Sequence, residues 1–151
     1  LAMTISVAFG HITGALPDGR KAGIPLAEGG ISPYQGRNTS GVSSTLASVA
    51  ALDQTRLSHG SILNLRISKK AVESERNLEK LADALRIFCE TGGDLVQFNF
   101  VDTNTLRDAQ QHPERYRDLL VRVATYSAYF VELSRELQDD IIARFEFSDI
   151  G

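Results

Sequence analysis

Residues 119–144 read LLVRVATYSAYFVELSRELQDDIIAR, and this stretch determines how the remaining sequence is interpreted. A short β-rich run at residues 119–123 enters a tight turn formed by residues 124–126. A second apolar run follows, and its apolar residues then recur at helical spacing, which predicts a helix over residues 134–145. The stretch therefore predicts a strand, a tight turn and a helix in close succession.

Strands and helices alternate along the rest of the chain. Runs rich in β-branched and apolar residues predict strands, whereas apolar residues spaced three and four apart predict helices. Strands are expected at residues 4–9, 62–67 and 95–101, and helices at residues 42–52, at residues 74–90 and, capped by Asp102 or Thr103, up to Gln111. This alternation predicts a mixed α/β fold.

Composition excludes several classes of protein. The chain has 151 residues, 42% of them hydrophobic, and a net charge of -3, which is ordinary for one globular domain. Lys and Arg (16) are outnumbered by Asp and Glu (19), tryptophan is absent and no basic stripe occurs, which argues against nucleic acid as a partner. No apolar run reaches the roughly 18 residues that a membrane span needs. A single cysteine excludes an internal disulfide and suits the cytoplasm.

A long segment at residues 10–41 is rich in glycine, proline and polar residues: GHITGALPDGRKAGIPLAEGGISPYQGRNTSG. Such a length without regular structure is unusual inside a compact domain, and is more often functional or wrapped on a partner surface. A phosphate-binding loop is a weak alternative, because the G-x-x-x-x-G-K-[ST] pattern does not occur.

Three segments resemble the glycyl radical enzymes, a family that includes pyruvate formate-lyase-like proteins. They are TGALPDGRKAGIPLAEGGISPYQG at residues 13–36, GGDLVQFNFVDTNTLRDAQQHPERY at residues 92–116, and RVATY with FVEL and IIAR within residues 122–144. The resemblance is closest to the branch of glycerol and diol dehydratases, choline lyase, hydroxyproline dehydratase and formate acetyltransferase-like enzymes. It covers nearly the whole chain.

The resemblance implies a fold and a place within it. In these enzymes a ten-stranded barrel encloses two finger loops, one with the radical glycine and one with a catalytic cysteine. Residues 1–151 would be a C-terminal fragment, with residues 1–101 associated with the barrel and residues 102–151 similar to the glycyl radical domain. The chain begins abruptly, as the interior of a longer protein would. Residues 62–67 and 95–101 would be barrel strands, and the segment after Val123 would be the radical finger.

By the same resemblance, Thr125 occupies the position of the radical glycine, and Arg122, Val123, Ala124 and Tyr126 frame it. A glycyl radical is planar at the α-carbon, so the Cβ of a threonine would crowd it. An L-residue also offers one α-hydrogen where glycine offers two. Glycine further allows a turn with positive φ, which a β-branched residue resists. The sequence therefore predicts the setting of a radical without the residue that holds it.

Three amides interrupt apolar strands, namely Asn64, Gln97 and Asn99. One interpretation is alternation, with the amides facing solvent. The other is that they line the cavity of the barrel, because a buried amide needs partners and often marks a pocket. Both interpretations stay open at this stage.

The remaining reactive residues favour no site of their own. Cys89 falls on the apolar face of the 74–90 helix, which predicts a small buried side chain without a redox role, so the catalytic cysteine is missing from this chain. The histidines lack metal-ligand spacing, so no metal site is expected and capping or surface contacts are predicted instead. The histidines are His11, His59 and His112. Glu136, Asp139 and Asp140 are interpreted as acids that stabilise the start of the last helix.

The resemblance also implies partners and an anaerobic radical reaction. A radical S-adenosylmethionine activating enzyme with an iron–sulfur cluster would install the glycyl radical, and this chain would bind no cofactor itself. Other expected partners are the remainder of the barrel, a larger homologous enzyme, or a second copy in a homodimer. The implied activity is that of a dehydratase or lyase on a small polar substrate, with this chain inactive alone. A stand-alone spare-part protein that replaces a damaged radical domain, or a degenerate structural relative, are the alternatives.

Overall fold

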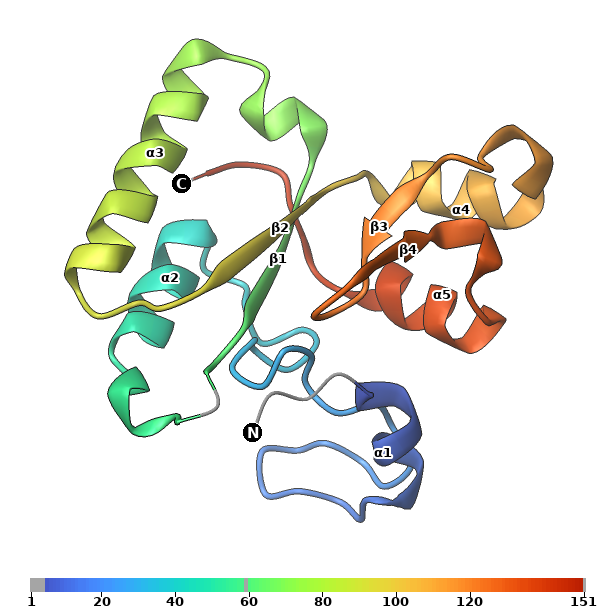
Figure 1. Ribbon diagram of the computed structural model, residues 1–151, viewed down its shortest axis with the longest axis horizontal. Helices are drawn as coiled ribbons and strands as arrows, with labels where there is room; N and C mark the ends of the chain where they lie inside the picture. Colours follow the sequence, from blue (N-terminus) through green and yellow to red (C-terminus); the bar gives the residue numbers. More distant parts are fainter. Residues whose placement is uncertain (1–4, 59, 151) are drawn as a thin grey trace.

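Two apolar clusters organise the computed structural model, which describes residues 5–58 and 60–150 (Figure 1). The first cluster surrounds a three-stranded sheet of order β2-β1-β5, in which β1 pairs in parallel with both neighbours. Its elements are β1 (Leu63–Ile67), β2 (Val96–Phe100), β5 (Glu146–Phe147), α2 (Val42–Ala50) and α3 (Glu75–Glu90). The structure thus confirms the α/β class, and the predicted strands and helices of this part lie within two residues of their expected bounds.

The central strand β1 is buried along its whole length, as expected for a parallel strand covered by helices. Its register with β2 runs from Leu63 opposite Val96 to Ile67 opposite Phe100. Helix α3 begins after Ser74, whose hydroxyl accepts the amide hydrogen of Asn77 at 3.2 Å, and this cap satisfies one donor of the first turn. The sheet and α3 pack through apolar side chains because each buries one face.

The second cluster joins α4 (Thr103–Gln111), the antiparallel hairpin of β3 (Leu120–Arg122) and β4 (Ser127–Tyr129), and α5 (Arg135–Ala143). In Figure 1 these elements lie together at the right, away from α2 and α3. Short 3-10 helices η1 (Gln54–Arg56), η2 (Lys69–Val72), η3 (Pro113–Arg115) and η4 (Phe130–Glu132) connect the elements of both clusters. The buried residues of the second cluster are Val101, Leu106, Ala109, Val121, Val123, Phe130 and Ile141.

The buried Arg66 side chain connects the two clusters. From β1 it donates hydrogen bonds to the carbonyl of Ile141 at 2.9 Å, to the Thr103 hydroxyl at 3.0 Å and to the carbonyl of Arg144. Glu146 completes this seam, because its carboxylate accepts the amide hydrogen of Thr103 at 2.7 Å. Asp102 occupies the N-cap position of α4, as predicted, but its side chain makes no capping hydrogen bond, and the Glu146 carboxylate accepts the Thr103 amide hydrogen instead.

The last helix ends earlier than predicted. Helix α5 opens after Ser134 as expected, but it stops at Ala143, and Arg144 is extended with φ of −62° and ψ of 142°. Phe145 therefore leaves the helical stripe and packs edge-on against Phe147, with ring centroids 4.9 Å apart. The cause is tertiary, because the chain here turns to pair with β1 as β5.

The predicted strand at residues 4–9 is also wrong where the structure describes it, and Thr4 lies outside the described residues. Residues 6–12 form α1 (Ser6–Ile12). A Cβ at Gly10 would overlap the backbone at Ile24, so this glycine lets the helix lie directly on the following loop. The Leu26 amide also donates to the Ser6 carbonyl at 3.0 Å, which ties the loop back to α1.

The segment predicted to lack regular structure, residues 10–41, begins with the last three residues of α1, whereas residues 13–41 contain no helix or strand and are ordered by an internal arginine. The Arg20 side chain is 2% exposed and donates to four backbone carbonyls at 2.8–3.0 Å. Those carbonyls belong to Thr13, Gly14, Lys21 and Ile24. The segment is therefore a folded loop that satisfies its own backbone groups.

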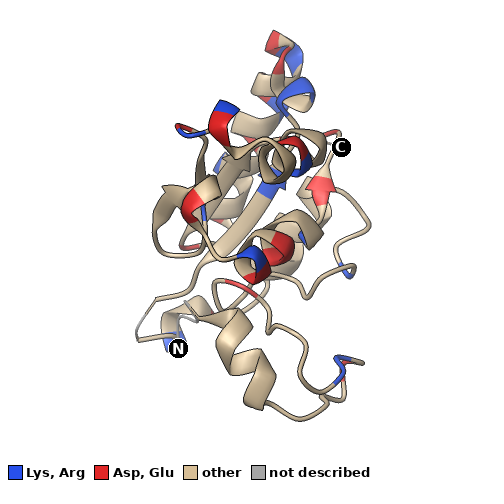
Figure 2. Cartoon of the chain, turned by 90° about the vertical axis from the view of Figure 1, so that its right-hand side faces the viewer, with Lys and Arg blue, Asp and Glu red and all other residues tan. Residues whose placement is uncertain are grey.

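Acidic and basic residues are interspersed along α3, α4 and α5, whereas α1 and α2 carry no Lys, Arg, Asp or Glu (Figure 2). Among the helices of the described residues, none combines the length and the apolar character needed to cross a membrane.

Candidate functional site

Thr125 lies at the tip of the β3–β4 hairpin. The amide hydrogen of Val123 is donated to the carbonyl of Tyr126 at 2.9 Å, which closes a tight turn around Ala124 and Thr125. Ala124 is buried, whereas Thr125 and Tyr126 are exposed. The predicted turn is therefore present, and it presents Thr125 outward.

The backbone of this turn accepts an L-residue. Every described residue with positive φ is a glycine, so Thr125 has negative φ. The expectation that a β-branched residue would strain the turn is therefore wrong. Of the three physical objections to threonine at this position, the crowding of a planar α-carbon and the single α-hydrogen remain.

Arg122 closes the turn from one side. Its Nε donates to Oε1 of Gln97 at 2.7 Å, its Nη2 to the carbonyl of Thr125 at 3.0 Å, and its Nη1 to the Ser127 hydroxyl at 3.3 Å. The planar guanidinium makes these contacts together because its donors are fixed in a fork. The carbonyl at the hairpin tip is thereby linked to strand β2.

Asn99 holds the backbone of the same arginine. Its Nδ2 donates to the Arg122 carbonyl at 2.7 Å, and its Oδ1 accepts the Arg122 amide hydrogen at 2.6 Å. Gln97 and Asn99 are two positions apart on β2 and so lie on one face. Alternating amides on a strand were the sequence signal for this contact, which both side chains make with Arg122.

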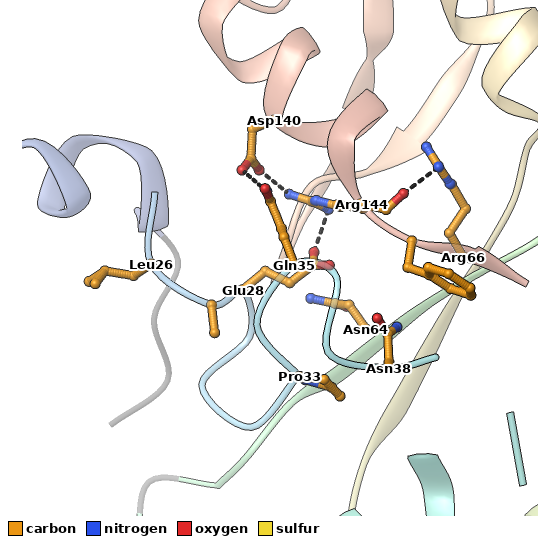
Figure 3. A pocket seen from close by; sticks show the side chains of 11 residues that line it. Leu26, Glu28, Pro33, Gln35, Asn38, Asn64, Arg66, Asp140 and Arg144 are labelled. Atoms are coloured by element: carbon orange, nitrogen blue, oxygen red, sulfur yellow. Dashed lines mark hydrogen bonds and ion pairs between the residues drawn. The ribbon is translucent and has the colours of Figure 1, made fainter. Parts of the chain in front are cut away.

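Asn64 differs from the other two amides, because it is 7% exposed and lines a small polar cavity of about 20 Å³ (Figure 3). That volume is about the size of one water molecule. Neither side-chain atom of Asn64 has a hydrogen-bond partner among the described residues. The cavity is closed on its other side by Glu28, Asp140 and Arg144, as Figure 3 shows.

Arg144 is the centre of this buried ionic cluster. Its Nη1 lies 2.5 Å from Oε2 of Glu28 and its Nη2 lies 3.1 Å from Oδ2 of Asp140. The same Nη1 donates to the Val123 carbonyl at 2.7 Å, on the strand that enters the turn. Asp140 is buried and also accepts from Gln35 at 2.9 Å, so its predicted role as a helix-dipole acid does not describe it.

Burial changes the pKa of Glu28 in this cluster and that of the neighbouring Arg66. Desolvation raises the pKa of Glu28 from 4.5 to about 7; the Arg144 charge opposes this rise and the Asp140 charge adds to it. Burial lowers the pKa of Arg66, although the Glu146 carboxylate opposes the shift. Glu28 therefore titrates near neutral pH because burial disfavours its charged form more strongly than the Arg144 guanidinium favours it.

A wider cleft of about 510 Å³ lies between α1 and the hairpin. Apolar side chains of both elements line it, and His11 pairs with Glu136 beside it, which agrees with the predicted surface role of that histidine. Thr125 and Tyr126 form part of its wall. The hairpin tip thus borders a hollow large enough for several side chains.

The other reactive residues stay apart from the hairpin. Cys89 is exposed on α3, so its predicted burial is wrong, because the buried face of that helix runs through Leu81 and Phe88. His112 contacts Asp108 at 2.9 Å near the surface, and His59 lies outside the described residues. Within residues 5–58 and 60–150, no group of three or more His, Cys, Asp or Glu side chains is placed to hold a metal ion.

Comparison with known proteins identifies the family. Residues 27–131, which include the hairpin, match the family described as "Glycine radical". The chain belongs to the glycine radical family. The resemblance stated from the sequence is therefore confirmed.

Relatives in this family share the sequence along almost the whole chain. Trans-4-hydroxy-L-proline dehydratase of Clostridioides difficile is 42% identical over 146 residues, 97% of this chain and 18% of that protein. The probable dehydratase YbiW of Escherichia coli strain K12 is 45% identical over 146 residues, 96% of this chain and 18% of that protein. The chain thus spans about a fifth of the length of these relatives.

A solved structure shows the same fold. The glycerol-bound, B12-independent glycerol dehydratase of Clostridium butyricum superposes with a TM-score of 0.90 at 44% identity, over 95% of this chain and 18% of that one. The chain therefore corresponds to the C-terminal part of a glycyl radical enzyme barrel. The residues that sequence reasoning missed in this part are Glu28 and Arg144, whose pairing joins distant segments and leaves no local pattern.

Proposed function

We propose that this chain is the radical-loop portion of a dehydratase- or lyase-type glycyl radical enzyme that acts on a small polar substrate. Thr125 would occupy the position of the radical glycine, framed by Arg122, Val123, Ala124 and Tyr126. The observation that carries the proposal is that the family match includes a tight turn whose tip is Thr125. The reaction class follows that of the dehydratases to which the chain is similar.

The chain's own residues would hold the loop and keep it shielded. Arg122 and Asn99 anchor the two ends of the turn to β2 through hydrogen bonds of 2.6–3.0 Å. A rigid loop in a closed site protects a reactive centre from water. Asn64, which lines the small cavity, would face the interior of the complete barrel.

The chain as given would not carry the radical. The threonine Cβ crowds a planar α-carbon, and Cys89, the only cysteine, is exposed on α3, away from the hairpin. The catalytic cysteine would therefore come from the remainder of the barrel or from a larger homologous enzyme. A radical S-adenosylmethionine activating enzyme with an iron–sulfur cluster would be the other partner, in an anaerobic cytoplasm, and a homodimer is compatible with this assignment.

Thr125 itself favours a second candidate function. A relative that has lost the glycine would keep the fold and serve only structure. The proposed radical-loop portion and the degenerate relative differ in what happens when the glycine is restored. A degenerate relative would also have lost its fit to the barrel. A spare-part protein, by contrast, would enter an otherwise complete enzyme.

Reconstitution tests the proposal. The glycerol dehydratase to which the chain is similar would be truncated to remove the matching segment, then mixed with the Thr125→Gly chain and an activating enzyme without oxygen. We expect one co-eluting complex and glycerol turnover. The unmodified chain should co-elute without turnover, and a Thr39→Gly chain, altered at an exposed loop residue, should behave like it. Failure to co-elute, or turnover with unmodified Thr125, would contradict the proposal.

A further inference from the structure

Arg144 connects three segments that are far apart in the sequence. It lies just after α5, its guanidinium contacts Glu28 of the 10–41 loop, and the same guanidinium donates to the Val123 carbonyl of the hairpin. We propose that Arg144 is a positioning residue for the Thr125 hairpin, and that Glu28 makes the position of the hairpin depend on docking of the 10–41 loop.

The hairpin side of this connection is a contact to the backbone. The Nη1 atom of Arg144 lies 2.7 Å from the carbonyl of Val123 and 3.4 Å from that of Arg122. These carbonyls directly precede the turn, so the contact fixes the turn whatever side chain stands at position 125. Arg144 is 6% exposed, and a charged donor in such surroundings makes a strong hydrogen bond.

The loop side is equally constrained. Gly29 follows Glu28 with φ of 68°, and a Cβ there would overlap the carbonyl oxygen of Ile62. The amide of Ile62 donates to the Gly29 carbonyl at 3.1 Å, which docks the loop against the start of β1. Glu28 is thus placed by the docked loop, and it reaches Arg144 only while the loop is docked.

Helix α5 supplies the third constraint. Asp140 lies one turn before Arg144 and pairs with its Nη2 atom at 3.1 Å, while Gln35 of the loop donates to the same carboxylate at 2.9 Å. Loop and helix therefore hold the guanidinium from two directions (Figure 3). The Nη1 atom that pairs with Glu28 is also the one that donates to the Val123 carbonyl, so the two ion pairs orient the planar guanidinium toward the hairpin.

Amide hydrogen exchange in the full chain separates positioning from general stability. The Val123 amide reports closure of the hairpin, the Ile62 amide reports docking of the loop, and the Leu63 amide, bonded to the Leu95 carbonyl at 3.1 Å, reports the core sheet. Arg144→Gln should raise exchange at Val123 and Ile62 by about tenfold to one-hundredfold, the range for losing one hydrogen bond to a charged group. Arg135→Gln, an exposed arginine of α5, is the matched control.

A double variant excludes a merely structural role. Arg144→Gln leaves the buried carboxylates of Glu28 and Asp140 without their shared cation, which weakens the whole fold. Combining it with Glu28→Gln removes one of the two charges, and Asp140 keeps the hydrogen bond that Gln35 donates at 2.9 Å. We expect protection at Leu63 to return while Val123 and Ile62 stay fast.

Three results would overturn the proposal: equal changes at all three amides in the double variant, a change at only one of Val123 and Ile62, or no change in Arg144→Gln. The significance of the hairpin rests on the proposed function, but its exchange is measured without any radical. A failed reconstitution would therefore leave the interpretation of the exchange measurements unchanged.

Discussion

The two apolar clusters hold their parts of the chain in different ways. The first is fixed by parallel ladder hydrogen bonds and by apolar side chains packed on the face of β1 that carries Leu63, Leu65 and Ile67. The hairpin of the second is fixed at its tip by three polar side chains, Asn99, Arg122 and Arg144, which bind backbone atoms. The stability of the sheet therefore comes from many weak contacts, whereas the position of the hairpin tip depends on a few directed hydrogen bonds.

This difference separates folding from function. Packing of β1 against α2 and α3 does not require any particular residue at position 125. The contacts of the tip are made to backbone carbonyls and amides of residues 122–125, so the side chain at position 125 can change without altering them. A turn that accepts threonine can keep its shape while losing a chemistry that needs glycine.

The largest expected effect comes from the seam between the clusters. Arg66→Met should lower the free energy of unfolding by about 3–5 kcal/mol, because it leaves a carboxylate and two carbonyls without their buried partner. Urea unfolding followed by circular dichroism measures this loss. Arg86→Met, at an arginine that is exposed on α3, should change it by about 0.5 kcal/mol or less. Equal losses in the two variants would show that Arg66 does not join the clusters.

The second prediction concerns pH. Because burial raises the folded-state pKa of Glu28 from 4.5 to about 7, the folded chain holds this proton more tightly than the unfolded chain. The resulting stabilisation, up to about 3 kcal/mol, is complete below pH 4.5 and is lost as the pH rises through 7. Glu28→Gln should remove this contribution, so that urea midpoints between pH 5 and pH 8 vary less than in the unmodified chain.

Glu79→Gln, at an exposed glutamate of α3, is the control for this pH series and should leave its slope unchanged. A slope that is identical in the Glu28→Gln chain would contradict the assignment of the neutral-pH titration to Glu28.

The same substitution can be compared at Asn99, which is bonded to the backbone of Arg122, and at Asn64, which lines the small cavity. Asn99→Leu should cost about 1–3 kcal/mol, because two backbone groups of Arg122 lose their partner. Asn64→Leu should cost less than Asn99→Leu, because neither atom of that amide makes a hydrogen bond of ordinary geometry among the described residues. Thermal unfolding of both variants measures the difference, and a larger loss at Asn64 would reverse the interpretation.

The smallest effect is expected at the tip itself. Thr125 has negative φ, so Thr125→Gly adds freedom to the unfolded chain without relieving any strain. The variant should lose about 0.4–1 kcal/mol of stability in urea unfolding. A gain in stability would mean that the turn is strained by threonine after all.

Local periodicity was sufficient for α2, α3, β1 and β2 of the first cluster. The spacing of Leu81, Leu85 and Phe88 predicts α3, and the apolar runs predict β1 and β2, because these elements bury a face of their own. The strand predicted for the N-terminal segment failed because the contact of Gly10 with the following loop favours α1, and no local pattern encodes that contact.

Some features of the candidate site could likewise be predicted from local sequence patterns, and others could not. The turn around Thr125 and the paired amides on β2 could be found in the sequence, because each is a local feature. The strand β5 and the pair of Glu28 with Arg144 could not, because they exist only when distant segments meet. The resemblance to a family identified the position of Thr125, but the residues that hold the turn required the fold.

Electron paramagnetic resonance tests the central claim most directly. The unmodified chain, Thr125→Gly and Ala124→Gly would each be combined with the remainder of the barrel, an activating enzyme, a reductant and S-adenosylmethionine under strict anaerobiosis. We predict a carbon-centred doublet in Thr125→Gly alone, because only that variant places a glycine α-carbon at the tip of the turn. A backbone radical on unmodified Thr125, or an equally strong doublet in Ala124→Gly, would contradict the assignment of this position.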